Sequence, residues 1–290
     1  MRSKKLSQKV IKDFGDEWAK FTFLEEQKIG EIEEQAKRYF ALLEDELKSE
    51  TLGLVADFGA GTGRWSQFIF RDCLELHLVE PSQGAYEVLK MRFGGQEKAR
   101  LLNERIEECS LENDSIDIGV CLGVLHHIPD TESALKSINA KLKPGGTLLA
   151  YMYYNLEGKN LFYRVLFSIS SLARRVISIF PSSSKRFICD VIAFLVYLPL
   201  ARISQKLSMR GVNTKNFPLH HYETLPFHVM RNDSLDRFGT RLEKRYSIEQ
   251  IRQMLSQTGF DLKTLVFSED EPFWTFKVKK TIAASRDAQI

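Results

Sequence analysis

The stretch that most constrains the fold is Val55-Ala56-Asp57-Phe58-Gly59-Ala60-Gly61-Thr62-Gly63, an apolar run that ends in an acid and three alternating glycines. This order predicts a buried strand and a tight turn, followed by a helix over residues 64–71. Because glycine lacks a Cβ atom, a ligand can lie directly against such a loop, and a helix N-terminus behind it favours an anionic group. Asp57 would repel a pyrophosphate, so the loop favours a ligand that carries both a carboxylate and an ammonium group.

Short apolar runs alternate with segments of helical spacing through the first half of the chain. The runs lie at residues 52–58, 74–79, 116–122 and 147–154, and the helical segments between them include 84–93 and 132–142. This alternation predicts βαβ units and a parallel sheet. Near the C-terminus, a helix beginning at Ser247 is followed by apolar runs at 260–267 and 273–278, which predict an antiparallel hairpin.

Composition bounds the class of protein. The chain has 290 residues, 43% of them hydrophobic, and 41 basic against 38 acidic residues, a net charge of +3 that is too small to indicate nucleic-acid binding. The four cysteines and six histidines show no metal-ligand spacing, so we expect no metal, and we expect Cys73 and Cys121 to be reduced core residues. No charge-free run reaches the roughly 18 residues of a membrane span. We therefore expect a cytoplasmic protein without a transmembrane segment, with a peripheral position at the inner face of the membrane as the alternative.

Five motifs occur in a fixed order: Asp57-x-Gly59-x-Gly61-x-Gly63, Glu80, Ser115-Ile116-Asp117, Leu125-His126-His127-Ile128 and Leu142-Lys143-Pro144-Gly145-Gly146. Together they resemble the motif series of class I S-adenosylmethionine-dependent methyltransferases of the type 11-like group. The resemblance covers residues 50–155, the C-terminal helix and the hairpin. It implies an α/β fold with a Rossmann-like, seven-stranded, mostly parallel sheet, an antiparallel C-terminal hairpin and an inserted helical lid.

The resemblance implies that S-adenosyl-L-methionine is the cofactor and assigns residues to it. Asp57 and the loop backbone would hold the methionine part, and Glu80 the ribose hydroxyls. Arg105 stands where relatives often carry the acid that contacts adenine, so Glu107 is the alternative partner for that base. The full set of expected cofactor residues is Asp57, Gly59, Ala60, Gly61, Gly63, Glu80, Pro81, Arg105, Ile106, Glu107, Leu122, Gly123 and His127. A nicotinamide dinucleotide is disfavoured by Asp57 and by the glycine spacing.

A second group of polar residues lies at 220–239, where three histidines fall within nine residues. Their mixture with aromatic and acidic residues shows no amphipathic period and predicts a loop of the kind that often carries substrate contacts. Catalytic candidates are His127, His221, Tyr222 and Asp233, and substrate candidates are Tyr153, Tyr154, His220, His221, Tyr222, Arg231 and Asp236. The alternatives are a solvated loop for this group and plain packing for His127.

Residues 161–180 and 187–200 have apolar helical spacing and predict a helical hairpin turned at 181–184. Three uses of this hairpin remain open: a lid over the active site, contact with a membrane or lipid-linked substrate through residues 161–200, and a homodimer interface. We divide the chain into an N-terminal arm and helix (1–50), a cofactor-binding core (51–155 and 241–280), a helical insertion or lid (156–240) and a tail (281–290).

The motifs favour transfer of a methyl group to an oxygen or nitrogen of a small-molecule or glycan acceptor by in-line displacement. The insertion resembles a bacterial subgroup associated with polysaccharide or natural-product biosynthesis. A lipid-linked acceptor is one alternative, and a cofactor-binding scaffold or membrane adaptor is the non-enzymatic one. We expect no nucleic-acid substrate, because residues 121–124 lack the Asn/Asp-Pro-Pro-Tyr/Phe type of tetrapeptide that would hold a flipped base.

Overall fold

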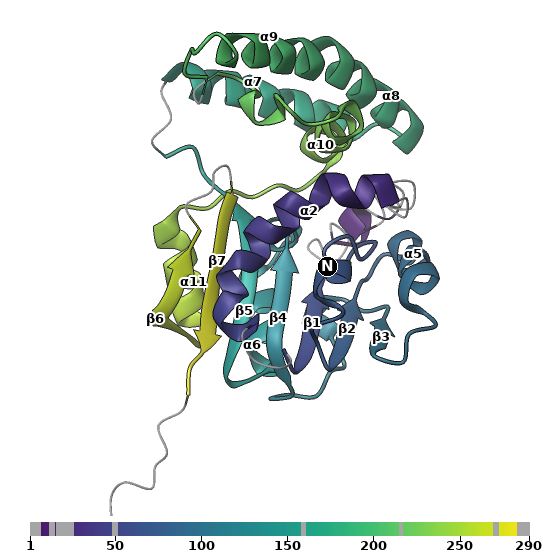
Figure 1. The fold of residues 1–290 in the computed structure, drawn as a ribbon, viewed down its shortest axis with the longest axis vertical. Coiled ribbons are helices and arrows are strands. Elements are labelled where there is room, and N and C mark those ends of the chain that lie inside the picture. Colours follow the sequence, from purple (N-terminus) through teal and green to yellow (C-terminus); the bar gives the residue numbers. More distant parts are fainter. Residues whose placement is uncertain are drawn as a thin grey trace, which may run out of the picture. The chain divides into compact units, whose positions relative to one another are not determined.

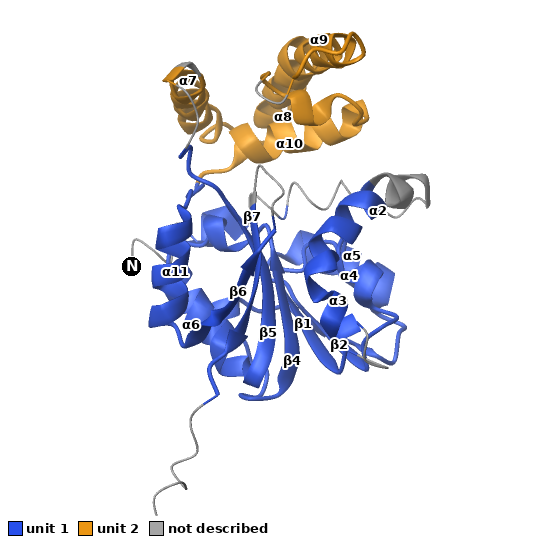
Figure 2. Ribbon diagram, turned by 60° about the vertical axis from the view of Figure 1, so that its left-hand side comes forward, with its two compact units in different colours: residues 1–157, 242–290 blue, residues 158–241 orange. Residues whose placement is uncertain are grey.

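The computed structural model describes residues 7–11, 15, 26–47, 52–157, 161–214, 217–268 and 273–282. The chain divides into two units, shown in different colours in Figure 2. The sheet unit comprises Met1–Glu157 and Leu242–Ile290, and the helical unit comprises Gly158–Arg241.

The sheet unit contains one seven-stranded sheet with the order β3-β2-β1-β4-β5-β7-β6 (Figure 1). Its strands are β1 (Leu54–Phe58), β2 (Glu75–Val79), β3 (Ala99–Leu102), β4 (Ile116–Leu122), β5 (Leu142–Tyr153), β6 (Phe260–Phe267) and β7 (Phe273–Lys280). Strands β1 to β5 are parallel, and β7 is antiparallel to β5 and β6. The predicted α/β fold with an antiparallel C-terminal hairpin is confirmed. Strand β5 begins at Leu142, earlier than the expected residue 147, with a register shift in its pairing to β4.

Helices cover both faces of this sheet (Figure 2). One face carries α2 (Glu26–Phe40), the 3₁₀ turn Ala41–Leu43, α3 (Glu44–Leu47), α4 (Ser66–Ile69) and α5 (Gln83–Phe93), and the other carries α6 (Thr131–Lys141) and α11 (Ile248–Gln257). Ser82, Asp130 and Ser247 cap α5, α6 and α11, because each side chain accepts a hydrogen bond from a first-turn amide. The helix expected over residues 64–71 is wrong, since only Ser66–Ile69 is α-helical.

Two apolar clusters fill the space between the sheet and its helices. Phe58 and Phe276 are the largest fully buried side chains, and both belong to the cluster on the α6 and α11 side. All four cysteines are buried free thiols, as expected for Cys73 and Cys121. Among the residues that the structure describes, no group of histidine, cysteine or acidic side chains has the arrangement of a metal site.

The helical unit consists of α7 (Leu161–Ile177), α8 (Ser182–Ile192), the π-helical turn Ala193–Tyr197, α9 (Leu198–Ser208), the 3₁₀ turn His220–Tyr222 and α10 (Phe227–Gly239). The loop predicted for residues 220–239 is wrong over most of its length. Pro226 precedes the first turn of α10, and Met230, Leu235 and Phe238 are buried along one side of it. Polar residues between these positions conceal the apolar spacing in the sequence.

The helix expected over residues 187–200 is longer than predicted. Helices α8 and α9 and the π-helical turn form one continuous helix, Ser182–Ser208. Among the described residues, this helix is the one that is long and apolar enough to cross a membrane, judged by length and composition. Of its most apolar 18-residue segment, 28% is buried. The helix nevertheless contains no charge-free run of 18 residues, because Lys185, Arg186, Asp190 and Arg202 interrupt it.

Candidate active site

The three loop glycines have different structural reasons to be glycine. Their φ angles are +84° at Gly59, +57° at Gly61 and +74° at Gly63, a region that L side chains rarely adopt. A Cβ atom would lie 2.6 Å from Val124 at Gly59 and 2.5 Å from Phe93 at Gly63, but would meet nothing within 4 Å at Gly61. Packing excludes side chains at the first and third glycine, and the space beside Gly61 is open to a ligand.

Glu80 follows the last residue of β2, and its side chain contacts the glycine loop. Its Oε2 accepts a hydrogen bond from the Gly61 amide at 2.9 Å, and its Oε1 accepts one from the Ser82 amide at 2.8 Å. Burial raises the pKa of Glu80 to about 7, although both amide hydrogen bonds act in the opposite direction. The parallel pairing of β1 with β2 brings this carboxylate beside the loop, as the sequence predicted.

Asp57 is the last residue but one of β1 and is 3% exposed. Burial raises its pKa to about 6, although the carboxylate accepts a hydrogen bond from the Ser66 hydroxyl, which lowers it. The Thr62 hydroxyl is also buried and, within the described residues, has no hydrogen-bond partner. Two buried acids and an unsatisfied hydroxyl around an open glycine fit a ligand that carries an ammonium group and sugar hydroxyls, as S-adenosylmethionine does.

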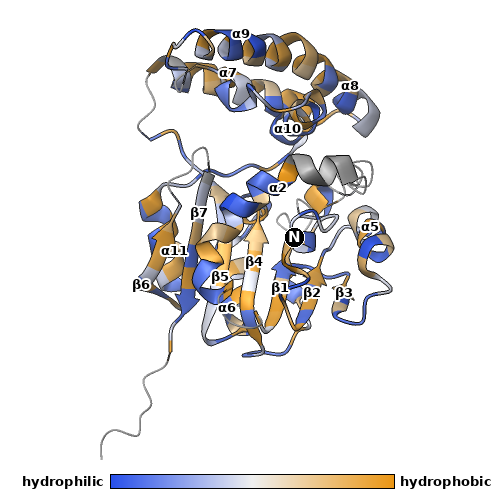
Figure 3. Cartoon of the chain, viewed as in Figure 1, coloured by the Kyte–Doolittle hydropathy of each residue, from blue (hydrophilic) through white to orange (hydrophobic). Residues whose placement is uncertain are grey.

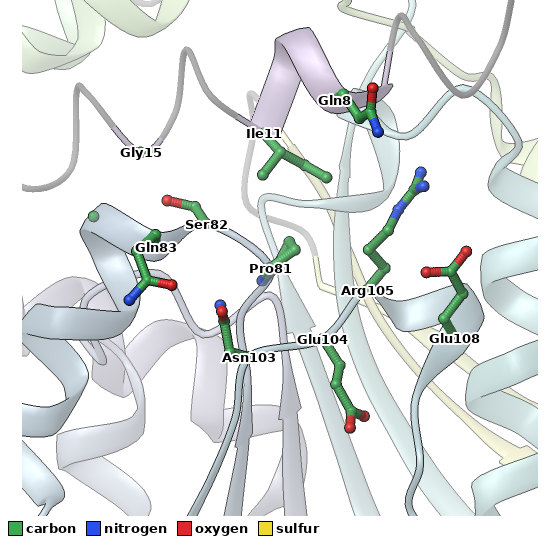
Figure 4. Close-up of a pocket in the computed structure, with 11 residues that line it drawn as sticks. Gln8, Ile11, Gly15, Pro81, Ser82, Gln83, Asn103, Glu104, Arg105 and Glu108 are labelled. Carbon is green, nitrogen blue, oxygen red and sulfur yellow. The ribbon is translucent and has the colours of Figure 1, made fainter.

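A cavity of about 540 Å³ lies beside Glu80 at the ends of β2 and β3 (Figure 4). Pro81, Asn103 and Arg105 are among its lining residues, so the predicted adenine segment faces a cavity. The Arg105 guanidinium donates a hydrogen bond to the Ser7 hydroxyl and lies 3.9 Å from a carboxylate oxygen of Glu107.

The other residues of the predicted adenine segment have different environments. Glu108 lines the cavity, whereas Glu107 is not one of its lining residues. Ile106 is 3% exposed and packs in the core. The expectation that Glu107 replaces the missing acid therefore has no support in the lining of this cavity.

Aromatic and imidazole rings gather at the carboxyl ends of β4 and β5. Tyr153 stacks on His126 at 3.8 Å between ring centroids, and His126 lies 4.2 Å from His127. Tyr151 stacks on His126 at 5.8 Å, and its hydroxyl lies 2.5 Å from where a Cβ of Gly123 would be. The Tyr151 ring therefore lies beside Gly123, which follows β4 and was predicted to line the cofactor cleft. We call Tyr151, Tyr153, His126 and His127 the ring cluster.

The segment at 242–246, which the sequence analysis missed, holds the ring cluster in place. The Leu242 carbonyl lies 2.7 Å from His127 Nδ1, and the Lys244 amide donates to the His126 carbonyl at 2.9 Å. The Arg245 guanidinium lies over the Tyr153 ring at 5.0 Å and pairs with Glu243 at 2.9 Å. The parallel bridge between Tyr154 and Tyr246 brings residues 242–246 next to the end of β5. No local sequence motif predicts this contact.

His126 is fully buried, and burial lowers its pKa well below the ordinary value, so the ring is neutral. Neither ring nitrogen has a hydrogen-bond partner among the described residues. An unpaired buried polar group costs about 1–3 kcal/mol, and such groups in native structures often mark functional positions.

Residues 56–148 match a family model described as a methyltransferase domain. The match covers about a third of the chain and, together with the fold, indicates an S-adenosylmethionine-dependent methyltransferase. Among curated proteins, no relative matches it.

Two solved structures, each of low sequence identity, share the fold of this chain. A possible exported protein from Bordetella parapertussis has a TM-score of 0.51 at 15% sequence identity, over 86% of this chain and 67% of that chain. A SAM-dependent methyltransferase from Methanosarcina mazei has a TM-score of 0.50 at 13% identity, over 83% of this chain and 98% of that chain. A third structure is a 1,6-didemethyltoxoflavin N1-methyltransferase from Burkholderia thailandensis, solved with 1,6-didemethyltoxoflavin and S-adenosylhomocysteine. Its TM-score is 0.48 at 16% sequence identity, over 85% of this chain and 78% of that chain.

Two further aromatic residues of the methyltransferase extend the ring cluster toward the glycine loop. Tyr39 of α2 stacks on Tyr151 at 5.4 Å and meets Trp65 edge-on at 5.1 Å, and Trp65 follows the loop directly. Helix α2 thus contributes an aromatic ring to this end of the sheet unit. Trp18, a residue too apolar to be expected in solvent, lies outside the described residues.

Tyr154, an expected wall of the acceptor site, does not join the ring cluster. It is 7% exposed and meets the Trp274 ring edge-on at 6.2 Å. Successive side chains of a strand point to opposite faces, which separates Tyr154 from Tyr153. Leu122, expected to line the methyl-donor cleft, is 6% exposed and packs with Tyr151 in the cluster on the α2 side.

The remaining predicted site residues belong to the helical unit, where several take part in its internal contacts. The Tyr222 hydroxyl donates to Asp233 Oδ2 at 3.0 Å, and burial together with that carboxylate raises the pKa of Tyr222 well above its ordinary value. Arg231 forms a bidentate pair with Asp190 of α8 at 2.8 and 2.7 Å.

The histidines of this group differ in setting. His220 and His221 occupy the 3₁₀ turn before α10, and His221 is exposed, with its ring 5.5 Å from that of Tyr222. Asp236 accepts a hydrogen bond from Thr240 through its backbone carbonyl. The structure thus brings Tyr222 and Asp233 into direct contact, as an internal pair of the helical unit.

Proposed function

We propose that this methyltransferase acts on an oxygen or nitrogen of a ring-containing small molecule or glycan bound against the ring cluster. The observation that supports this is the stack of Tyr151, Tyr153 and His126 beside Gly123. Open α/β folds bind ligands at the carboxyl ends of their strands, and aromatic faces with a few polar atoms suit sugars and planar rings. A polysaccharide or natural-product precursor fits this description.

The cofactor would be held by residues on three strand ends. The loop at Gly61 and the buried Asp57 would face the amino-acid part of S-adenosylmethionine, and Glu80 would accept hydrogen bonds from its ribose hydroxyls. Pro81 and Arg105 would line the space for adenine, with the guanidinium in place of the usual acid. When bound, the cofactor supplies an electrophilic methyl group on a sulfonium.

The protein's own contribution is positioning and proton removal. Holding the acceptor atom in line with the methyl group is worth up to about 7–11 kcal/mol in favourable cases. Because His127 Nδ1 lies 2.7 Å from the Leu242 carbonyl, we assign the proton to Nδ1, which leaves Nε2 as the basic nitrogen. We propose that Nε2 accepts the proton of the acceptor, a role that typically contributes 10²–10⁴-fold to the rate.

Within the helical unit, His221, Tyr222 and Asp233 are proposed as residues that bind an acceptor, with His220, Arg231 and Asp236 as their neighbours. The raised pKa of Tyr222 means that its hydroxyl keeps its proton at neutral pH. In this proposal Tyr222 and Asp233 act as a hydrogen-bonded pair that orients the acceptor, and Tyr222 is a donor rather than a base.

A lipid-linked acceptor is the second candidate. It is favoured by the large exposed apolar side chains of the helical unit, among them Leu161, Ile169 and Leu195. In this variant the same ring cluster would receive the polar head of the acceptor.

The test is release of S-adenosylhomocysteine from S-adenosylmethionine across a panel of phenols, amines, free sugars and polyprenyl-linked sugars. We expect turnover with one class, a kcat about 10²-fold lower in His127→Gln, and an unchanged cofactor Kd in that variant. His228→Gln, which changes a histidine of α10, is the matched control and should keep its kcat. Equal kcat in both variants would remove His127 from the chemistry, and cofactor binding with no turnover on any acceptor class would contradict the proposed acceptors.

A further inference from the structure

Helix α7 is amphipathic, but its apolar face points outward. Leu161, Val165, Ile169, Leu172 and Val176 recur every three or four residues, which places them on one side of the helix. Each of them is between 50% and 77% exposed. This is the reverse of the pattern in a soluble helix, whose apolar stripe faces the core.

The inward side of α7 is polar. Ser170 and Ser171 accept hydrogen bonds from Arg237 of α10 at 2.8 and 2.9 Å, and the same guanidinium lies over the Phe167 ring at 4.3 Å. Arg174 donates to the Thr240 carbonyl at 3.1 Å. Helix α7 therefore packs on α10 through hydrogen bonds and leaves most of its large apolar side chains outside, with Ile177 as a buried exception.

The continuous helix Ser182–Ser208 shows the same inversion. Its buried positions are small or polar and follow a helical spacing: Lys185, Cys189, Ala193, Tyr197, Ala201 and Ser204. Its exposed side chains include Phe187 (71%), Phe194 (58%) and Leu195 (63%). Hydrophobic residues recur along this helix in Figure 3. The apolar stripes of these two helices are therefore not buried against each other within the helical unit.

Hydrogen bonds fix the orientation of this second helix. Lys185 Nζ donates to the Gly239 carbonyl at 3.1 Å, and the Ser234 hydroxyl donates to the Cys189 carbonyl at 2.8 Å. Turning the apolar face inward would break these buried contacts, each of which would then leave an unpaired polar group. The outward apolar face is therefore a property of how the unit packs.

Charge is also divided between the units. Residues 158–241 contain 13 lysines and arginines and four acids, a net charge of +9. The remaining residues contain 28 basic and 34 acidic side chains, a net charge of −6. Arg164 and Arg175 on α7, and Arg202 and Lys206 on α9, are exposed among the apolar side chains.

We propose that the outer face of α7 and of the helix Ser182–Ser208 binds an anionic lipid bilayer and lies in its interfacial plane. Exposed apolar side chains interleaved with basic ones fit acyl chains and lipid phosphates together. A second copy of the same face would bring the same exposed arginine and lysine side chains against those of the first and be repelled. A spanning orientation is disfavoured, because it would take Lys185 and the Asp190–Arg231 pair into hydrocarbon.

This inference rests on the surface of the helical unit and does not require the proposed acceptor. Its test is flotation of the full chain with vesicles of phosphatidylglycerol and phosphatidylcholine, compared with phosphatidylcholine alone. We expect binding to the anionic vesicles, weakened in high salt. The variant Ile169→Ser/Leu172→Ser/Leu195→Ser should lower the bound fraction at least tenfold, since three exposed apolar anchors are lost.

The control variant changes two apolar residues of the sheet unit that are equally exposed, Leu74→Ser/Met91→Ser, and should bind as the parent does. S-adenosylmethionine binding by each variant reports folding independently of lipid. Three results would overturn the proposal: no vesicle binding by a protein that still binds cofactor, a dimer abolished by the triple variant without lipid binding, or membrane association that resists alkaline carbonate.

Discussion

The sheet unit and the helical unit place their side chains by opposite rules. The sheet unit buries Phe58 and Phe276 completely and covers its sheet with helices on both faces. The helical unit buries Lys185, Asn232 and Ser204 and exposes rows of leucine, isoleucine and phenylalanine. Both units contain helices with clear apolar periodicity, so periodicity identifies a helix without deciding which side faces inward. Packing partners decide that, and the partners of α7 and of the helix Ser182–Ser208 include polar groups such as Arg237 and Ser234.

The largest expected contrast is in stability. Phe276→Ala removes a fully buried ring from the middle of β7 and should lower the free energy of unfolding by about 3–5 kcal/mol. Ile169→Ser, at a 62% exposed position of α7, should change it by less than about 0.5 kcal/mol. Urea denaturation followed by circular dichroism measures both. A large loss in Ile169→Ser would show that the apolar face of α7 is buried in solution.

Within the sheet unit, the glycine loop separates folding from binding. Gly59→Ala adds backbone strain and a contact with Val124, and should destabilise the fold by about 2–4 kcal/mol. Gly61→Ala adds only the backbone strain, about 1–2 kcal/mol, because its Cβ would meet no protein atom. That Cβ would instead occupy the open space in which we expect the ligand to lie. We expect Gly61→Ala to weaken S-adenosylmethionine binding at least tenfold in calorimetry. Unchanged affinity in a folded Gly61→Ala variant would place the ligand elsewhere.

The buried lysine tests the polar interior of the helical unit. Lys185→Met removes the donor to the Gly239 carbonyl and should destabilise the unit by about 1–3 kcal/mol. Its neighbour Arg186, which is only partly buried, provides the control Arg186→Met. Limited proteolysis within residues 158–241 should accelerate in Lys185→Met and not in the control. Equal rates would mean that this interior does not depend on its polar contacts.

The smallest expected effect is a pH dependence of the two buried acids. Their pKa values, about 6 for Asp57 and about 7 for Glu80, lie above those of an unfolded chain, so the folded protein without cofactor binds more protons. Its stability should fall as the pH rises from about 4 to 7. Cofactor affinity should change in the opposite sense, because the charged carboxylates accept hydroxyl and ammonium protons.

Calorimetry from pH 8.5 to 5.5 should show weaker binding below pH 7, approaching about tenfold per pH unit once the acids are protonated. An affinity that is constant over this range would mean that neither acid contacts the cofactor.

Local patterns predicted the part of the site that lies close together in sequence. The apolar run that ends in Asp57 and the glycines predicted both the strand and its turn. The alternation of strands and helices predicted that Glu80 follows β2. The ring cluster could not be predicted in the same way. His127 meets Leu242 across 115 residues, and Tyr39 reaches Tyr151 from the N-terminal helix. Such contacts depend on strand order and packing, which no local spacing records.

The polar residues at 227–239 show a second limit. Their mixture predicts a loop, whereas the buried Met230, Leu235 and Phe238 hold them in α10. In this helix Arg231 pairs with Asp190, and Asp233 accepts a hydrogen bond from Tyr222. The local sequence pattern predicts neither contact.

The central claim is that the loop at Gly61 and the buried Glu80 bind S-adenosylmethionine. Calorimetric titration of the full chain at pH 8 tests it most directly, with Glu80→Ala as the variant and Glu75→Ala, at the start of β2, as the control. Two hydroxyl hydrogen bonds to a buried carboxylate are each worth about 1.5–3 kcal/mol. We predict one site per chain, an affinity at least about 100-fold weaker in Glu80→Ala, and an unchanged affinity in Glu75→Ala. Absence of binding by the parent protein, or equal affinity in the parent and Glu80→Ala, would contradict the account.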